Sequence, residues 1–423
     1  MSRLPWALLL AVSQSPGAPA ASTAADAGAV PTTDVEVQFA YRVSLEPSER
    51  VANVRLEVRQ REPGLARLKF HVDPAQHLGF EGEGDIAVEG SDYVVWTVPP
   101  RGGAIEWTSR LDHLRDPTSY DARFGTNWAL FRGSDLVPPA ASRYVSGSRS
   151  SGTLRLNLPK KWKFVSRHPI GDDGRYDLED PDRFFARPSG WMMVGRIETL
   201  TFDVEGMEVT LATTRKLGVD LMELRSFLRW TLPTFEAILG ELPPRLVLVG
   251  AGDPMWRGGL SGPQSIYLHR DRPLVDDDGT SPILHELTHV FMGAKAGPGG
   301  DWIVEGLAEY YAIEVLYRSG GMSPSERIDA HRRLRRKGRK VDELEVDHAK
   351  SRVTARSVAV LDRLDQRMRD LTDDRANLDL VLRRLVALDE PITTELFKSL
   401  VEEVVGQKMD AFFETYVAQA QSP

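Results

Sequence analysis

Residues 281–311 read SPILHELTHVFMGAKAGPGGDWIVEGLAEYY and predict two successive helices rich in histidine and glutamate. Ser281 followed by Pro282 is typical of a helix start, because a hydroxyl caps the first turn and proline fits its first position. Gly293 is typical of a helix end, since glycine adopts the left-handed conformation that closes many helices. A second helix follows, and Asp301 is placed to cap it.

Two histidines and a glutamate lie together on the first of these helices. His285 and His289 are four residues apart, so both imidazoles project from one face and can reach a single metal ion. Glu286 follows His285 directly and points into the same pocket from a slightly rotated position. A general base for a metal-activated water acts from such a position. The pattern therefore predicts a zinc site with Glu286 as its catalytic base.

The second helix supplies the acidic ligand that such a site still needs. Catalytic zinc takes three protein ligands and keeps a fourth position open. Glu305 falls in the first turns of this helix, and Glu309 lies four residues later on the same face. We predict one Zn²⁺ with Glu305 as the third ligand, and Glu309 as the acceptor of a ring N–H from His285. The opposite assignment of the two glutamates stays open.

The composition is that of a soluble globular chain with two or three domains. Of its 423 residues, 41% are hydrophobic and 27% are charged, and the formal net charge is −8. This acidic balance argues against nucleic acid as the main partner. The basic run 332–340 is followed at once by the acidic stretch 342–347, which indicates a solvated, self-compensating segment. The chain has no cysteine, which excludes thiolate zinc ligands and disulfides.

The first 33 residues differ from the rest of the chain. Arg3 precedes a short apolar run, and small residues follow up to Ala20. We interpret residues 1–20 as a secretory signal peptide and residues 21–33 as a linker, with a disordered Ala-rich arm as the alternative. The expected protein is secreted or periplasmic. No later segment has the roughly 18 unbroken apolar residues of a membrane-spanning helix, so we expect no membrane insertion.

Hydrophobic periodicity divides the remaining chain into an α+β multidomain fold. Residues 34–215 alternate apolar and polar side chains, beginning with the run from Val35 to Leu45, and predict an N-terminal β-sandwich-like domain. Residues 216–320 mix helix and strand patterns and predict a catalytic domain with a mixed α/β core. Residues 321–423 are predicted as a C-terminal helical domain.

Several elements of the predicted catalytic domain can be placed from the sequence. A helix should follow Asp220, which has capping-box spacing with Glu223. Pro233 lies inside this helix and is expected to kink or split it. Residues 245–251 predict a buried strand, and residues 265–271 predict a second strand with alternating side chains.

The strand at 265–271 is expected to lie beside the metal helix. An exposed strand there would pair with an extended peptide through backbone hydrogen bonds. Two glycines before the strand would let the chains approach closely. On this basis substrate binding is assigned to Gly258, Gly259, Ser265, Ile266 and Tyr267. An ordinary strand flanked by a turn is the alternative.

These motifs resemble the glycyl aminopeptidase-like family of gluzincin metallopeptidases. The similarity spans residues 35–418 and is carried by HELTH, WIVEGLAEYY, FAYRVSLEP, LRLNLPKKWKFVS, RGGLSGPQSIYLHRD and the closing helices. It implies an N-terminal β domain, a thermolysin-like catalytic domain and a C-terminal helical part. It also implies one zinc ion on His285, His289 and Glu305, and a peptide or protein substrate.

The chain departs from that family at two places. Ser261 stands where relatives carry a glutamate that holds the free amino group of the substrate. Val353 and Thr354 stand where relatives carry a tyrosine pair thought to stabilise the oxyanion. Ordinary aminopeptidase activity is therefore not assumed.

Other polar side chains near the expected site are candidates for the missing oxyanion donor. His348 lies in the segment that should approach the site from the C-terminal part, and it is our candidate. Tyr310 and Tyr311 follow Glu309 on the same helix and are expected to pack in the core. His331 is expected on the surface.

The sequence thus predicts an exported zinc metallopeptidase in which Glu286 activates water, with exo- or endopeptidase action left open. The alternative is a catalytically impaired gluzincin relative that serves as an exported, zinc-containing binding or scaffold module. The two differ in whether peptide bonds are hydrolysed.

Overall fold

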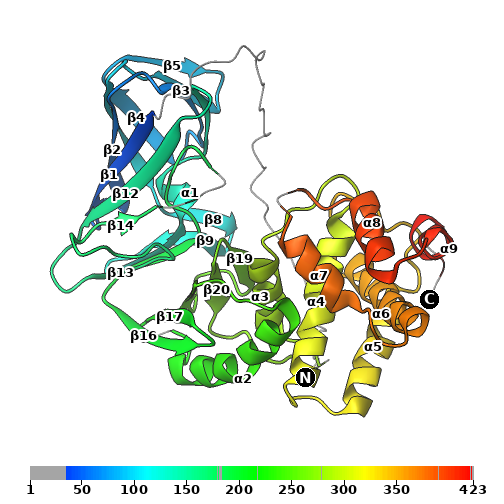
Figure 1. Ribbon diagram of the computed structural model, residues 1–423. Coiled ribbons are helices and arrows are strands. Elements are labelled where there is room, and N and C mark those ends of the chain that lie inside the picture. Colours follow the sequence, from blue (N-terminus) through cyan, green and yellow to red (C-terminus); the bar gives the residue numbers. More distant parts are fainter. Residues whose placement is uncertain are drawn as a thin grey trace.

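The computed structural model describes residues 35–178, 180, 183–216, 218–277, 279–388, 390–419 and 421. A β-rich part, a mixed α/β part and a helical part follow one another along the chain (Figure 1). The predicted signal peptide and linker lie outside the described residues. No helix among the described residues is long and apolar enough to cross a membrane.

Three sheets build the N-terminal β part around one shared core. The first sheet has the order β14-β12-β1-β2-β7-β4, from β1 (Glu36–Glu46), β2 (Val51–Gln60), β4 (His77–Gly82), β7 (Gly102–Arg110), β12 (Arg149–Asn157) and β14 (Tyr176–Asp177). The second has the order β13-β15-β10-β9-β8, from β8 (His113–Asp116), β9 (Ser119–Phe124), β10 (Trp128–Arg132), β13 (Lys163–Val165) and β15 (Trp191–Gly195). The third has the order β11-β3-β6-β5, from β3 (Leu65–His71), β5 (Asp85–Glu89), β6 (Tyr93–Thr97) and β11 (Ala140–Tyr144); a short helix, α1 (Gly133–Leu136), follows β10.

The alternating pattern of the first strand explains why this part is β. Every second side chain of β1, from Val37 to Leu45, is buried, while the intervening side chains reach solvent or are half-buried. One face of the strand thus contacts the core and the other faces outward. The β character predicted for this part is confirmed, and its architecture is three sheets around a single core.

The mixed part is built on a five-stranded sheet of order β16-β17-β18-β20-β19. Its strands are β16 (Ile197–Val204), β17 (Met207–Thr214), β18 (Arg245–Ala251), β19 (Gly259–Gly262) and β20 (Ser265–His269). β17, β18 and β20 are parallel, and β19 is an antiparallel edge strand. The predicted boundary after residue 215 therefore needs correction, because β16 and β17 pair with this sheet and not with the N-terminal ones.

Helix α2 (Leu221–Leu239) crosses between two parallel strands of this sheet. Asp220 caps it, accepting hydrogen bonds from the backbone N–H groups of Met222 and Glu223. Pro233 lies inside the helix, yet the helix continues past it, so it does not split the helix, and the expected kink stays a prediction. The apolar face around the proline, including Leu232 and Phe235, is buried against the core and holds the helix together.

In the described part of the chain, eight helical segments follow the sheet and share its core. They are α3 (Pro282–Met292), α4 (Asp301–Arg318), α5 (Pro324–Gly338), α6 (Arg352–Thr372), α7 (Leu378–Val386), α8 (Thr394–Val405), α9 (Asp410–Phe413) and a π-helical turn (Glu414–Ala418). The C-terminal helices pack around α4 (Figure 1), so the mixed and helical parts form one hydrophobic unit. The helical character predicted for residues 321–423 is confirmed.

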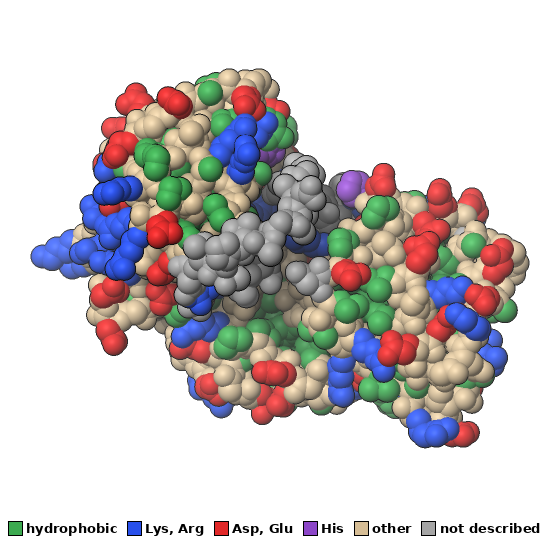
Figure 2. All heavy atoms as spheres, turned by 45° about the horizontal axis from the view of Figure 1, so that its top comes forward, with side chains coloured by type: hydrophobic (Ala, Val, Ile, Leu, Met, Phe, Trp, Pro, Cys, Tyr) green, Lys and Arg blue, Asp and Glu red, His purple; other side chains and the backbone are tan. Residues whose placement is uncertain are grey.

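Arginines of α5 pair with acidic side chains of the neighbouring helices. Arg327 pairs with Glu314 on α4, and Arg335 pairs with Asp362 on α6. Acidic and basic side chains are also interspersed over the helical part in Figure 2. Of these two arginines only Arg335 belongs to the basic run 332–340, and it pairs with α6, so compensation of the run by the acidic stretch 342–347 stays a prediction.

The packing of α4 on α6 depends on Gly306, which directly follows Glu305. A Cβ at this position would lie 2.6 Å from the Cβ of Ser357 and 2.9 Å from Cδ1 of Leu361, both on α6. Gly306→Val should therefore lower the free energy of unfolding by about 1–3 kcal/mol through overpacking. Denaturant unfolding would measure this, and adding Ser357→Gly should restore part of the loss. An unchanged midpoint for the single variant would contradict the close approach of the two helices.

Candidate metal centre

The metal helix begins and ends as the sequence predicts. The hydroxyl of Ser281 accepts a hydrogen bond from the backbone N–H of Leu284, Pro282 occupies the first turn, and Gly293 closes α3 with a φ of 60°. Asp301 is different: it is the first residue of α4 and makes no cap bond. Its carboxylate instead accepts a hydrogen bond from the backbone N–H of Ala349, so the predicted capping role is wrong.

Three side chains from α3 and α4 converge on one point. Nε2 of His285 and Nε2 of His289 are 3.1 Å apart. Carboxylate oxygens of Glu305 lie 3.7 Å from the first nitrogen and 3.4 Å from the second. All three side chains offer a ligand atom within 4.8 Å of the others, and His285 and Glu305 are buried.

These separations fit a tetrahedral zinc ion. Zinc–nitrogen bonds of about 2.05 Å in a tetrahedron place neighbouring ligand atoms about 3.3 Å apart. In the metal-free protein one of these two nitrogens can donate a hydrogen bond to the other, and a bound cation would take the lone pairs of both. The donor set of two imidazoles and a carboxylate suits zinc and leaves a fourth position open.

Glu309 orients the first histidine. Its Oε2 lies 3.0 Å from Nδ1 of His285, on the side of the ring opposite Nε2. When the Nδ1–H group donates a hydrogen bond to this carboxylate, Nε2 is unprotonated and its lone pair faces His289 and Glu305. The geometry matches the predicted roles, with Glu305 among the metal ligands and Glu309 as the hydrogen-bond partner of His285.

Charge and burial shift the protonation of this cluster in the metal-free protein. Burial alone would lower the pKa of His285, but the hydrogen bond with Glu309 and the charges of Glu309, Glu305 and Glu286 raise it to about 9. Burial lowers the pKa of His289 well below its usual range, and the neighbouring His285 adds to this. Burial raises the pKa of Glu305 to about 7 despite the attraction of His285.

Zinc uptake should therefore depend on pH and release protons. A metal ion needs the unprotonated ring of His285 and the ionised carboxylate of Glu305, whose pKa values are raised to about 9 and about 7. Zinc affinity should rise as the pH increases from 6 to about 9 and then level off. Calorimetric titration in buffers of different ionisation enthalpy measures the released protons. Affinity that is constant between pH 6 and 9 would contradict this protonation pattern.

Removing the orienting carboxylate should weaken zinc binding without destroying the site. Glu309→Ala leaves all three ligand side chains in place but frees the ring of His285. Outer partners of this kind contribute about 10–100-fold in metal affinity, so a loss of that size is expected. Competition with a chromophoric chelator measures it. Unaltered affinity would show that Glu309 does not orient His285.

Glu286 faces the edge strand of the sheet. Its Oε2 accepts a hydrogen bond of 2.7 Å from the backbone N–H of Ser261 in β19. Gly259 allows this approach, since a Cβ there would lie 3.3 Å from Cγ of Glu286. The carboxylate is buried and held beside the metal cluster by the edge strand. The side chain of Ser261 is neutral.

The assigned substrate-binding residues divide between two strands. Gly259 begins β19, the edge strand, and Gly258 directly precedes it. Ser265, Ile266 and Tyr267 lie in β20, which is hydrogen-bonded to β18 on one side and to β19 on the other. Their predicted role is therefore wrong, because this backbone has no free edge and their side chains are buried. Within the described residues, the edge strand of this sheet that lies beside Glu286 is β19, and a peptide could add there.

The buried hydroxyl groups of that strand are engaged in hydrogen bonds. The Ser265 hydroxyl accepts a hydrogen bond of 2.7 Å from the backbone N–H of Trp191. The Tyr267 hydroxyl donates to the carbonyl oxygen of Trp256 at 2.7 Å. The first contact crosses to β15 of the N-terminal part, whereas the second stays within the mixed part. Both leave these hydroxyl groups unavailable to a substrate.

The two tyrosines after Glu309 face the core, as predicted. Tyr310 and Tyr311 are fully buried, and the hydroxyl of Tyr311 donates to Asp379 at 3.1 Å. His331 is buried beside Glu314 and Asp362, so its predicted surface position is wrong. None of these side chains turns toward the metal cluster.

The remaining oxyanion candidates lie near the start of α6. Val353 and Thr354 belong to its first turn, and the hydroxyl of Thr354 donates to the carbonyl oxygen of Ala349. His348 is exposed in the preceding loop, where its charge acts on Asp301 at the start of α4. The role of His348 as an oxyanion donor stays a prediction.

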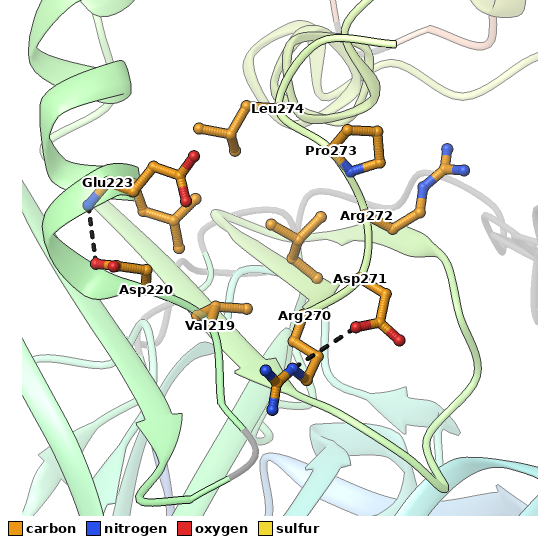
Figure 3. A pocket seen from close by; sticks show the side chains of 10 residues that line it. Val219, Asp220, Glu223, Arg270, Asp271, Arg272, Pro273 and Leu274 are labelled. Carbon is orange, nitrogen blue, oxygen red and sulfur yellow. Dashed lines mark hydrogen bonds and ion pairs between the residues drawn. The ribbon is translucent and has the colours of Figure 1, made fainter. Parts of the chain in front are cut away.

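A separate cavity of about 240 Å³ lies between the start of α2 and the loop that follows β20 (Figure 3). Its lining is drawn from residues 219–224 and 268–274, with Glu223 and Arg270 on different walls. These residues are distinct from the metal cluster.

A helix carrying two histidines and a glutamate, followed by a helix carrying a glutamate ligand, is the arrangement of gluzincin metallopeptidases, which this chain resembles. No protein-family model matches the chain, and no curated protein matches it. Solved structures do match its fold. An aminopeptidase N family protein from Idiomarina loihiensis has a TM-score of 0.62 at 14% identity, with 89% of this chain and 72% of that chain covered.

Two further solved structures are mutants of M1 zinc metallopeptidases. A two-domain enzyme bound to L-tryptophan has a TM-score of 0.59 at 15% identity, with 91% of this chain and 94% of that chain covered. An enzyme from Deinococcus radiodurans bound to a Tyr-Ser-Ala substrate has a TM-score of 0.57 at 14% identity, with the same coverage. The chain therefore shares its fold with an aminopeptidase N family protein and with M1 zinc metallopeptidases, in agreement with the resemblance seen in the sequence.

Proposed function

We propose that this protein is a zinc metallopeptidase that holds one Zn²⁺ through His285, His289 and Glu305. The observation that carries the proposal is the convergence of two imidazole nitrogens and a carboxylate, with the carboxylate of Glu286 beside them. A structural zinc site has no use for that additional carboxylate, whereas a hydrolytic site requires a base. The fold shared with zinc aminopeptidases supports the same conclusion, and we infer a thermolysin-like arrangement of the mixed part.

The side chains divide the chemistry among them. Zinc held by these three residues would supply a Lewis acid able to polarise a scissile carbonyl and to lower the pKa of a water. Glu286 takes a proton from that water and passes it to the leaving amine. Ser261 holds Glu286 in position through its backbone N–H, and Glu309 holds His285. An extended peptide would add to the free side of β19 through backbone hydrogen bonds.

The substrate proposed is a peptide or protein whose free amino group is not anchored by an acid on β19. The neutral Ser261 is adjacent in space to Glu286, and it offers no negative charge to an ammonium group. Endopeptidase action, or processing of a narrow set of substrates, fits this site better than general aminopeptidase action. The bound Tyr-Ser-Ala of one structural neighbour supports a peptide substrate.

A second candidate function is a zinc-containing binding or scaffold module. The observation that favours it is at the start of α6: the side chain of Val353 has no donor, and the hydroxyl of Thr354 donates to the carbonyl oxygen of Ala349. Digestion of a peptide library, read by mass spectrometry for the wild-type protein and for Glu286→Gln, separates the two. New peptides from the wild type alone support the peptidase and show whether cleavage is internal or terminal. No new peptides from either protein would support the binding module.

We also propose that the protein is exported to the periplasm or the medium. This rests on the signal-peptide pattern of residues 1–20. Mass spectrometry of the protein from the exported fraction should find an N-terminus near Ala21. An intact Met1 in the cytosolic fraction would contradict export.

A further inference from the structure

A hairpin of the N-terminal part reaches the loop that leads into the edge strand. The hairpin is formed by β8 and β9, and the loop is residues 252–258. The backbone N–H of Tyr120 donates to the carbonyl oxygen of Pro254, and the backbone N–H of Trp256 donates to the carbonyl oxygen of Tyr120, both at 2.9 Å. The loop is thus paired with a strand that belongs to another sheet.

The indole ring of Trp256 fills the space between this hairpin and the edge strand. The guanidinium of Arg115, on β8, lies 4.0 Å from the centre of the ring. On the other side the ring lies against Gly258, where a Cβ would come within 1.7 Å of a ring carbon. The side chain of Trp256 is therefore held between a cation of the N-terminal part and the residue that precedes β19.

The carboxylate of Asp121 forms an ion pair with Arg115 and so holds its guanidinium in place. This carboxylate lies 2.9 Å from Nη1 of Arg115 and 2.6 Å from Nη1 of Arg132, while His113 approaches at 3.3 Å. Asp121 is buried, so losing its charge would leave two arginines without their shared partner. The guanidinium of Arg132 stacks 4.2 Å from the ring of Trp191.

The mixed part holds the same loop from its own side. The hydroxyl of Tyr267 donates to the carbonyl oxygen of Trp256 at 2.7 Å, and the backbone N–H of His269 donates to the carbonyl oxygen of Gly258 at 2.9 Å. Three residues beyond Gly258, the backbone N–H of Ser261 donates to Glu286. Contiguous contacts therefore run from Asp121 to the carboxylate proposed as general base.

We propose that Trp256, anchored by Arg115 and Asp121 of the N-terminal part, is a positioning residue. It holds the edge strand β19 in place, and the strand in turn holds the carboxylate of Glu286. This inference rests on the proposed peptidase function. β19 has four residues and, among the residues that the structure describes, a strand partner on one side only, so its position depends on how its preceding loop is held. A proton-transferring carboxylate must lie within a few tenths of an ångström of its productive position, and a looser strand would lose that placement.

Variants of Trp256 test the role through the kinetics of peptide hydrolysis. Trp256→Ala should lower kcat about 10–100-fold while KM changes less than about threefold, with zinc content near one per chain. Trp256→Phe keeps a ring between Arg115 and Gly258 and should restore most of kcat. Asp121→Asn, in the other part of the molecule, should lower kcat in the same direction. Equal kcat in Trp256→Ala and the wild type would overturn the proposal.

Trp230 offers a matched control. Its ring also packs against a glycine, Gly321, and its indole N–H donates to the carbonyl oxygen of Ser319, but it lies on α2, outside these contacts. Trp230→Ala should leave kcat within about twofold of the wild type. A kcat loss as large as that of Trp256→Ala would show a general effect of indole removal and would overturn the proposal.

Hydrogen exchange provides a readout that needs no activity. In Trp256→Ala the amides of residues 259–262 should exchange at least about tenfold faster, while those of α3 keep their protection. If the wild type hydrolyses no peptide yet this change occurs, the peptidase proposal fails and the anchoring of the strand stands. If exchange in 259–262 is unchanged, the positioning role fails whatever the activity of the wild type.

Discussion

Replacing Glu286 with glutamine is expected to lower peptide hydrolysis by about 10²–10⁴-fold while zinc content stays near one per chain. The amide has nearly the same shape as the carboxylate and can still accept the hydrogen bond from Ser261. It cannot take a proton from water at neutral pH, so the step assigned to this residue is lost. Initial rates with a cleaved library peptide and metal analysis by mass spectrometry give both quantities.

The same chemical change on the surface serves as the control. Glu395 is exposed in the first turn of α8, away from the metal cluster, and Glu395→Gln should hydrolyse peptide at the wild-type rate. Hydrolysis retained in Glu286→Gln would remove this residue from the role of general base. Loss of zinc in that variant would instead point to Glu286 as a ligand.

His285→Ala should abolish stoichiometric zinc binding. It removes one of the three ligands and also leaves the carboxylate of Glu309 without its ring N–H partner. An ion that binds only the folded protein stabilises it by mass action, so zinc should raise the melting temperature of the wild type and leave that of the variant unchanged. Metal analysis and thermal unfolding with and without zinc measure the two effects.

A histidine outside the cluster controls for the loss of an imidazole. His71 lies at the end of β3 in the N-terminal part, and His71→Ala should keep one zinc per chain. Full zinc content in His285→Ala would show that the metal is held elsewhere. A zinc-dependent rise in melting temperature of that variant would lead to the same conclusion.

The metal cluster could be predicted because local rules decide it. His285 and His289 are joined by a single helix whose start at Ser281 and end at Gly293 follow capping chemistry. Given one helix, the spacing of four residues places both rings on one face. The prediction of Glu305 as a ligand required one further assumption, namely that the next helix packs antiparallel or crossed against the first. The fold of the chain satisfies this assumption.

The edges of the sheet could not be predicted in the same way. An alternating pattern shows that Ile197–Val204 and Ser265–His269 are strands, but it does not say which strands they pair with. For this reason the boundary at residue 215 and the substrate role of Ser265, Ile266 and Tyr267 were wrong. Strand order depends on contacts between distant segments, as in the parallel pairing of β18 with β20.

The contact that holds Glu286 could not be predicted from the pattern of side chains in the sequence. It comes from the backbone N–H of Ser261, a group that every residue except proline possesses. The pairing of Tyr120 with Pro254 and Trp256 is also made by the backbone. Only the two glycines, Gly258 and Gly259, signalled that chains approach closely at this place.

The measurement that tests the central claim most directly is a zinc titration of the metal-free protein, followed by peptide hydrolysis. Wild-type activity should be absent without metal, rise in proportion to added zinc and saturate at one equivalent per chain. Glu286→Gln should bind the same equivalent of zinc and stay inactive. Hydrolysis that persists after complete removal of metal, or that never appears at any zinc concentration, would contradict the assignment of this site as a zinc peptidase centre.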